Sequence, residues 1–284
     1  MASILVTGAA GFIGRALCQY LRGQGHEIAE LTRKNGDITE RATFSSLAPA
    51  DHVFHLAGRA FVPDSWKDPL EFHRVNVIGT ANALEHCREH GARLTFVSAY
   101  IYGVPDSLPV SEACAPRPNN PYALSKFLAE QVCAFHAAHH GVDVTVVRPF
   151  NIFGPGQKTH FLIPQIIGQI KERTAIRVKH LAPRRDYLFI DDLVDALGRT
   201  LGGPRGYNVV NIGSGSSVSV RELIDVIQSV AGTELEVVEE GKVRPNEMDD
   251  VYADIEKARD LLGWVPAVSL REGLERMMLE EPVS

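Results

Sequence analysis

The chain has 284 residues, and its 29 lysines and arginines against 35 aspartates and glutamates give a formal net charge of −6. This balance argues against nucleic acid as a partner, and no apolar run approaches the roughly 20 residues that span a bilayer. The length suits one large domain or two smaller ones with a substantial core. Four cysteines without metal or redox spacing favour free thiols in a reducing cytoplasm. We expect no signal peptide, because the first strand begins by residue 3.

The first predicted element is a strand at 3–7, followed by a turn with Gly8, Gly11 and Gly14 and then by a helix. Such a turn lets a pyrophosphate bind backbone N–H groups at the positive end of a helix dipole. Gly8 permits the tight turn, Gly11 the approach of the phosphates, and Gly14 close packing of helix on strand. The spacing differs from the common dinucleotide fingerprint, so a purely structural turn is the alternative.

Further apolar strands are predicted at 53–56, 94–97 and 144–147, and helical patterns separate them. Strands that alternate with helices indicate a doubly wound α/β fold with a parallel sheet. Ligands of such a sheet bind beyond the carboxyl ends of its strands. Ser98, which directly follows the strand at 94–97, is therefore a candidate site residue.

The next helix carries a candidate acid–base pair. An asparagine as N-cap and Pro121 in the first helical position predict where it begins. Tyr122 and Lys126 then lie four residues apart on one face. A neighbouring ammonium lowers the pKa of a phenol, which would allow proton exchange near neutrality. Ser98 could hydrogen-bond the substrate oxygen that Tyr122 protonates, although this spacing also arises by chance.

Other polar positions are more ambiguous. Asn76 interrupts an apolar helical stretch and is either functional or an exposed or capping residue. Two histidine pairs, His86 with His90 and His136 with His140, have a spacing that can hold a metal on a helix. No third ligand is evident, so we expect solvated helix faces and no metal.

These residues combine with further motifs along nearly the whole chain. The motifs are the glycine turn, segment 55–58, Asn76, Ser98, Tyr122 with Lys126, and segments 148–156, 185–193, 244–247 and 253–264. Together they resemble the extended short-chain dehydrogenase/reductase family that modifies nucleotide sugars. The resemblance implies a Rossmann-type dinucleotide-binding domain at 1–156 and 187–213. It also implies a smaller mixed α/β substrate-binding domain at 157–186 and 214–284.

The family's functional residues can be carried over position by position. They imply catalytic roles for Ser98, Tyr122 and Lys126, with Asn76 beside them. The implied cofactor site consists of Gly8, Gly11, Phe12, Ile13, Gly14, Thr32, Arg33, Asp37, Ile38, Leu56, Ala57, Gly58, Arg59, Asn76, Tyr122, Lys126 and Pro149. The implied nucleotide-sugar site includes Ser98, Tyr122, Asn151, Phe161, Leu162, Arg185 and Arg244. The two arginines would bind the diphosphate, whereas Phe161 and Leu162 equally suit a helix packing face.

The end of the second strand, at 26–34, bears on the choice of cofactor. An acidic residue about 20 positions after the glycine turn would bind the ribose 2′-hydroxyl of NAD, but Thr32 and Arg33 fall there. A carboxylate would repel a 2′-phosphate, whereas Arg33 and Lys34 would attract one. We therefore expect NADP(H) rather than NAD(H), although Glu30 would permit NAD if the strand ended early.

The resemblance leaves several reactions open. Segments 154–157 and 181–186 resemble the reductases of GDP-4-keto-6-deoxymannose, which favours reduction of a nucleotide-diphosphate 4-keto-6-deoxyhexose. A nucleotide-sugar 4-epimerase, similar to UDP-glucose 4-epimerase, is the alternative, and a non-catalytic dinucleotide sensor is the third. Dehydration is disfavoured because Ala99 and Tyr100 stand where dehydratases carry an Asp-Glu pair. The family also implies a homodimer in which helices around 67–90 and 121–140 form a four-helix bundle.

Overall fold

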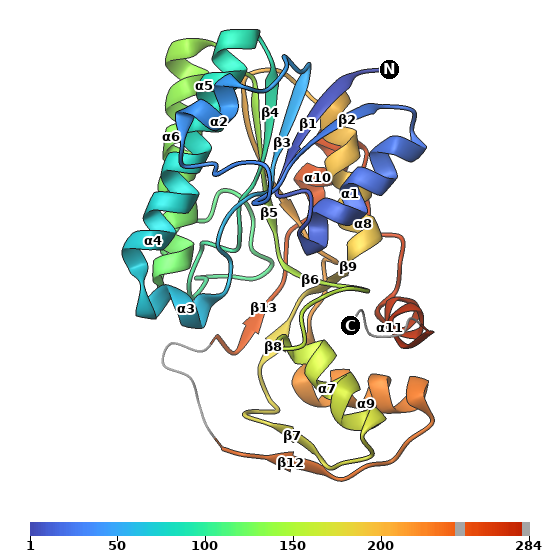
Figure 1. Ribbon diagram of the computed structural model, residues 1–284. Helices are drawn as coiled ribbons and strands as arrows, with labels where there is room; N and C mark the ends of the chain where they lie inside the picture. The colour runs from blue at the N-terminus through green and yellow to red at the C-terminus, as the bar shows by residue number, and fades with distance from the viewer. Residues whose placement is uncertain (242–247, 280–284) are drawn as a thin grey trace.

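The computed structural model describes residues 1–241 and 248–279. A parallel sheet forms its centre, and β2 and β3 lie on opposite sides of β1 (Figure 1). In spatial order its six strands are β2 (Glu27–Leu31), β1 (Ser3–Thr7), β3 (His52–His55), β4 (Arg93–Val97), β5 (Val144–Pro149) and β10 (Tyr207–Ile212). This order confirms the doubly wound α/β fold and places the switch point next to the glycine turn.

Helices cover both faces of the sheet (Figure 1). One face carries α1 (Phe12–Gly23), α8 (Ile190–Arg199) and α10 (Glu256–Leu262), and the other carries α2 (Arg41–Ser45), α5 (Gly79–His90) and α6 (Pro121–His140). Every residue of β3 and β5 is buried, because strands covered on both sides have no solvated face. This burial explains why Val53 and Phe54, and Val146 and Val147, are neighbouring apolar residues in these strands.

A series of short helical segments precedes α5. These are α3 (Val62–Lys67), α4 (Pro69–His73) and a π-helical turn at Arg74–Ile78 that runs directly into α5. Asp68 caps α4 by accepting a hydrogen bond from Glu71 N at 3.1 Å. π-helical turns often mark functional positions, and this one contains Asn76.

The remaining elements form a second lobe below the sheet in Figure 1. Its helices are α7 (Leu162–Lys171), α9 (Val220–Ala231) and α11 (Leu270–Leu279). Its small sheets pair β7 (Ile176–Val178) with β12 (Val237–Glu239), and β8 (Arg184–Arg185) with β11 (Val218–Ser219) and β13 (Asp250–Val251). β6 (Asn151–Phe153) pairs with β9 (Tyr187–Phe189). The 3₁₀ turn at Thr200–Gly202, which follows α8, is not part of this lobe, because Thr200 bonds Thr95 of β4.

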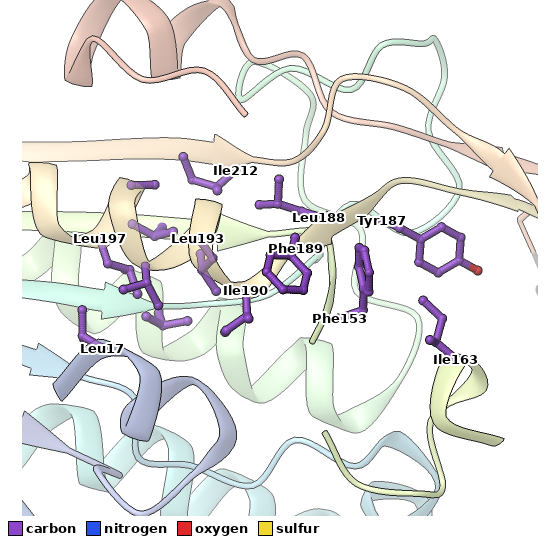
Figure 2. Close-up of a cluster of buried hydrophobic side chains, with 14 of the residues drawn as sticks. Leu17, Phe153, Ile163, Tyr187, Leu188, Phe189, Ile190, Leu193, Leu197 and Ile212 are labelled. Atoms are coloured by element: carbon purple, nitrogen blue, oxygen red, sulfur yellow. The ribbon is translucent and has the colours of Figure 1, made fainter. Parts of the chain in front are cut away.

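One apolar cluster connects the two lobes (Figure 2). Phe153 and Phe189 meet at 5.5 Å between ring centroids, with Leu17 of α1 and Ile163 of α7 in the same cluster. α10 also packs on β10, although the division made from the sequence gives residues 214–284 to the substrate lobe. That division is therefore kept as a proposal. Within the described ranges, every helix is too short or too polar to cross a lipid bilayer.

Candidate active site

The glycine turn between β1 and α1 leaves no space for side chains at two of its positions. Gly8 has a φ of +73°, and a Cβ atom there would lie 2.7 Å from the backbone nitrogen of Ala57. A Cβ at Gly14 would lie 2.2 Å from the carbonyl oxygen of Gly8. The tight turn and the close helix packing predicted from the sequence are thus present. Gly11 is the N-cap of α1 and has no side chain, which leaves the helix N-terminus accessible to an anion.

The end of β2 lies beside this turn, because Gly8 N donates to Leu31 O at 2.8 Å. β2 ends at Leu31, so Arg33 and Lys34 follow it as exposed cations. β2 thus ends earlier than the predicted 34, which is the case in which Glu30 would permit NAD, and Glu30 pairs with Arg22 of α1 at 2.5 Å.

Three further expected cofactor residues lie in the segment after β2. Asp37 Oδ1 accepts hydrogen bonds from the backbone and the hydroxyl of Thr39, both at 2.9 Å, and these bonds lower the pKa of Asp37. Ile38 is buried against α5, where a Cβ at Gly79 would lie 2.5 Å from Ile38 Cδ1. Ile38 is thereby fixed by helix packing, and Thr32 is tied to Asn35 Oδ1.

The loop after β3 is held by Asn76. Asn76 Oδ1 accepts from Arg59 N at 2.8 Å, and its Nδ2 donates to Arg59 O at 3.0 Å and to Ser125 Oγ at 2.8 Å. Asn76 is 1% exposed, so it is neither a surface residue nor a helix cap. It connects the loop of Leu56, Ala57, Gly58 and Arg59 to α6, which indicates a positioning function.

One face of α6 lies against the end of β4. Asn120 caps the helix by accepting from Ala123 N at 2.9 Å, as the sequence predicts. Tyr122 packs with Ala99 and Ile101 just beyond β4, and Lys126 Nζ donates to Val97 O at 2.8 Å. The candidate phenol and ammonium are therefore both at the carboxyl end of the strand that precedes Ser98.

Burial acts against the predicted lowering of the Tyr122 pKa by Lys126. Burial raises the pKa of Tyr122 above its ordinary value, and burial lowers the pKa of Lys126 to about 8. Removal from water favours the neutral form of both groups, and the ammonium contacts the carbonyl of Val97 and the ring of Phe96. Tyr122 therefore keeps its proton at neutral pH.

The expected substrate residues lie around β6, α7 and β8. Asn151 is exposed at the start of β6 and donates to Asp186 O at 2.9 Å. Arg185 Nη1 donates to Arg184 O at 2.8 Å and to Met248 O at 2.7 Å. Phe161, the N-cap of α7, is 38% exposed. These residues belong to β6, β8 and the start of α7.

Three more expected residues lie at the ends of elements or outside the described residues. Leu162 is the partly buried first residue of α7, and Pro149 is the buried last residue of β5. Arg244 lies outside the described residues. Arg184, which neighbours Arg185, forms an ion pair with Glu222 of α9 at 2.8 Å.

Comparison with known proteins agrees with this architecture. A family model described as the NAD dependent epimerase/dehydratase family matches residues 4–213. The chain belongs to the NAD-dependent epimerase/dehydratase family. Solved structures of similar members hold either NADPH or NAD, so the family uses both cofactors.

Individual members of the family differ in their reactions. The chain is 33% identical to a GDP-6-deoxy-D-mannose reductase of Pseudomonas aeruginosa over 97% of its length and 95% of the relative. It is 31% identical to a UDP-glucose 4-epimerase of Mycolicibacterium smegmatis, which covers 96% of each chain. The solved structure of RMD from Pseudomonas aeruginosa with NADPH superposes with a TM-score of 0.89 at 32% identity, over 97% of each chain.

This family member also contains a buried polar network that the sequence analysis missed. Glu130 of α6 binds Ser98, at 2.5 Å, and Arg148 of β5. Arg148 Nη1 donates to Tyr102 at 2.8 Å, and the Tyr102 hydroxyl donates to Asn211 at 2.6 Å. One signal was present in the sequence, because Glu130 follows Lys126 at the same spacing at which Lys126 follows Tyr122.

Tyr187 is a second residue that the sequence analysis missed. Its side chain is at the edge of the apolar cluster, with its hydroxyl directed away from the other labelled residues (Figure 2). Tyr187 is 9% exposed, and its hydroxyl finds no hydrogen-bond partner among the described residues. It faces Asn151 across the β6–β9 pair, so it offers a free donor near the expected substrate residues.

The expectation that the histidine pairs lie on solvated faces is wrong for two of them. His86 is 1% exposed and His136 is 8% exposed. His86 is covered by Phe44 of α2, and His136 Nε2 lies 3.0 Å from Glu85. Within residues 1–241 and 248–279, no group of histidines, cysteines and carboxylates has the geometry of a metal site.

Proposed function

We propose that the protein reduces the 4-keto group of a nucleotide-diphosphate 4-keto-6-deoxyhexose, with NADPH as cofactor and Tyr122 as acid. The observation that carries this proposal is the convergence of Tyr122 and Lys126 on the carboxyl end of β4, where Ser98 follows. Burial keeps Tyr122 protonated and brings the pKa of Lys126 to about 8. A ketone reduction needs a proton donor at the new alcohol oxygen, and Tyr122 is in that state at neutral pH.

The proposed mechanism assigns each residue one task. NADPH, when bound, supplies a hydride to the carbonyl carbon. Tyr122 gives its phenolic proton to the carbonyl oxygen, so that the C=O group becomes an alcohol. Lys126, when charged, stabilises the phenolate left behind, and solvent returns the proton to Tyr122. Asn76 holds the loop at Arg59 against α6 by hydrogen bonds to both.

The choice of NADPH rests on the cations after β2. Arg33 and Lys34 are exposed there, and the carboxylate of Glu30 is paired with Arg22. Guanidinium and ammonium groups attract a 2′-phosphate, which a free carboxylate would repel. The relative solved with NADPH supports this choice.

The substrate would occupy the region between the sheet and the second lobe. Arg185 and Arg244 would bind its diphosphate, with Arg244 proposed from the sequence alone. Asn151 and the hydroxyl of Tyr187 would bind the nucleotide part, because both are polar groups at the start of the β6–β9 pair. Similarity to a GDP-6-deoxy-D-mannose reductase supports a 4-keto-6-deoxy sugar.

A 4-epimerase is the second candidate, and similarity to UDP-glucose 4-epimerases at 31% identity favours it. Dehydration is not proposed, because Ala99 and Tyr100 supply no carboxylic acid or base. Tyr100 instead donates to Gly103 O at 2.7 Å. A non-catalytic dinucleotide sensor is the third candidate, against which the intact Ser98, Tyr122 and Lys126 argue.

The deciding experiment follows the absorbance of reduced nicotinamide while the protein is incubated with NADPH and a panel of nucleotide 4-keto-6-deoxy sugars. We expect one NADPH to be consumed for each sugar reduced. Interconversion of two sugars without net cofactor change would instead identify an epimerase. Binding of NADPH with no conversion of any sugar, the 4-hydroxy sugars included, would identify a sensor.

A further inference from the structure

The peptide unit between Ile38 and Thr39 is fastened to α5. Asn82 Nδ2 donates to Ile38 O at 2.9 Å, and the Ile38 side chain, which is 8% exposed, packs beside Gly79. Asn82 is not among the residues expected to touch the cofactor, yet it fixes one that is. Because a peptide unit is planar, this hydrogen bond also sets the direction of the N–H group of Thr39.

That N–H group is directed to Asp37. Thr39 N donates to Asp37 Oδ1 at 2.9 Å, and the Thr39 hydroxyl donates to the same oxygen at 2.9 Å. Arg74 Nη1 donates to this hydroxyl at 2.7 Å. A guanidinium only donates and a hydroxyl has one proton, so the proton of Thr39 goes to Asp37. Both bonds use Oδ1, so Oδ2 of this exposed residue can accept from a ligand.

Asp37 lies beside the proposed site of the 2′-phosphate. Gly36 N donates to Thr32 O at 3.1 Å, which turns the chain back toward the end of β2, where Arg33 is located. The 2′-phosphate of NADPH is carried by the ribose that bears adenine, so Asp37 adjoins the adenosine half of the cofactor. The 6-amino group of adenine is a hydrogen-bond donor, and a carboxylate is an acceptor.

We propose that Asn82 is a positioning residue, which holds Asp37 where its carboxylate accepts a hydrogen bond from the adenine 6-amino group. The inference rests on the cofactor role in the proposed function. Asn82 acts through the peptide unit between Ile38 and Thr39 and does not touch the cofactor. Without its amide, Ile38 O loses a partner, the peptide unit is free to rotate, and the carboxylate no longer has a fixed place.

The test compares two cofactors that differ only in the base. Reduced nicotinamide hypoxanthine dinucleotide phosphate has a carbonyl group where NADPH has the 6-amino group. In isothermal titration calorimetry we expect the wild-type protein to bind NADPH about tenfold more tightly, the effect of one hydrogen bond to a charged group. Asn82→Leu should bring this ratio of dissociation constants close to one by weakening NADPH.

A purely structural role of Asn82 predicts a different result, because a general loosening of the site would weaken both cofactors alike. An unchanged ratio in Asn82→Leu would therefore overturn the proposal, and so would equal binding of the two cofactors by the wild type. In an Asp37→Ala background the ratio should already be close to one. Asn82→Leu should not change it further there, because Asn82 acts through that carboxylate.

Asn208→Leu is the matched control. The amide of Asn208 also donates to backbone carbonyls, those of Pro204 and Arg205, but Asn208 lies on β10, at the opposite edge of the sheet from β2. This variant should keep the wild-type ratio. If Asn82→Leu does not fold, Asn82→Ala removes the same amide with a smaller side chain and replaces it in the test.

The titration also separates this inference from the proposed function. It needs no sugar, so its result does not depend on which sugar the protein converts. If the protein binds NADH more tightly than NADPH, NADH and its hypoxanthine analogue give the same comparison, since both natural cofactors contain adenine. A failure of the proposed reduction is thereby distinguished from a failure of Asn82 to position Asp37.

Discussion

At the scale of single residues, the phenol of Tyr122 has the most direct consequence for activity. Its ring packs edge-on against Phe72, with 6.3 Å between centroids, so its direction is fixed by a side chain that the sequence analysis did not single out. Arg59 lies over the other ring of this pair, 5.2 Å from the centroid of Phe72. The loop after β3 thus contributes to the orientation of the proposed acid.

We predict that Tyr122→Phe abolishes turnover and spares cofactor binding. The variant keeps the ring and its contact with Phe72 but has no proton to give, so kcat should fall about 10²- to 10⁴-fold. Fluorescence titration should give a dissociation constant for NADPH close to that of the wild type. Tyr20→Phe is the control, because Tyr20 bonds Asp195 on the opposite face of the sheet and its loss should leave kcat unchanged. Full activity of Tyr122→Phe would exclude the proposed acid.

A second residue-scale prediction concerns cofactor choice. Arg33→Glu replaces the proposed partner of the 2′-phosphate with a like charge, so KM for NADPH should rise about 100-fold. KM for NADH, which has no such phosphate, should change little. Lys171→Glu makes the same charge change at the end of α7 and should alter neither value. Equal effects of Arg33→Glu on both cofactors would place Arg33 outside the phosphate site.

At the scale of elements, the glycine turn is constrained by backbone rather than by side chains. Gly14→Ala places a methyl group 2.2 Å from Gly8 O, and backbone cannot move aside without opening the turn. We expect a loss of about 3 kcal/mol in the free energy of unfolding together with weaker cofactor binding. Gly23→Ala is the matched control at the other end of α1, where a Cβ meets nothing within 4 Å. Urea denaturation of both variants measures the difference.

The central strands should make the protein acid-sensitive. His52 Nε2 lies 2.8 Å from Thr95 Oγ1 and His55 Nδ1 lies 2.8 Å from Thr7 Oγ1, and burial lowers the pKa of both histidines to about 3. The unfolded chain protonates them near pH 6.5, so it binds more protons than the folded chain below that pH. Stability should therefore fall as the pH is lowered from 6.5 toward 3.

The loss of stability caused by the two histidines can be measured at pH values above those at which carboxylates titrate. Between pH 6.5 and pH 5 each histidine should remove about 2 kcal/mol from the free energy of unfolding. His52→Gln should shrink the difference between urea unfolding at pH 7 and at pH 5 by that amount. An unchanged difference in the variant would show that His52 is already protonated in the folded state.

Local signals in the sequence predicted some elements and missed others for physical reasons. The start of α6 was predictable because Asn120 and Pro121 act on their own neighbours. The second strand was predicted at 26–34, but it ends at Leu31 because Asn35 bonds Thr32 and Glu30 and turns the chain. The position of His86 depends on α2, which helical periodicity does not reveal.

The candidate site, too, was predictable in part from local sequence patterns. Its residue types and places at the strand ends follow from local patterns, whereas their electrostatics depend on distant contacts. The pKa of Tyr122 is raised by burial that no spacing rule reports. The pairing of Glu130 with Arg148 joins α6 to β5, and only the packed fold brings these two elements together.

At the scale of the whole molecule, one surface is unusually apolar. Trp66, Leu70 and Phe135 are 63%, 80% and 54% exposed, and they belong to α3, α4 and α6, which contact one another. These helices form the outer side of one helical layer (Figure 1). Large apolar patches on a surface commonly mark an interaction site. We therefore propose that two copies pair α4, α5 and α6 about a two-fold axis, as the family implies, because such an interface is self-complementary.

This proposal predicts a species of about 62 kDa, twice the 31.1 kDa chain mass, in sedimentation experiments. Leu70→Glu should shift the protein to the monomer, because the two-fold axis brings two new carboxylates, one from each copy, into a desolvated interface. Val265→Glu introduces the same charge at a 51% exposed position outside these helices, so it should remain a dimer. A wild-type monomer, or equal behaviour of the two variants, would show that the apolar surface does not pair copies of this chain.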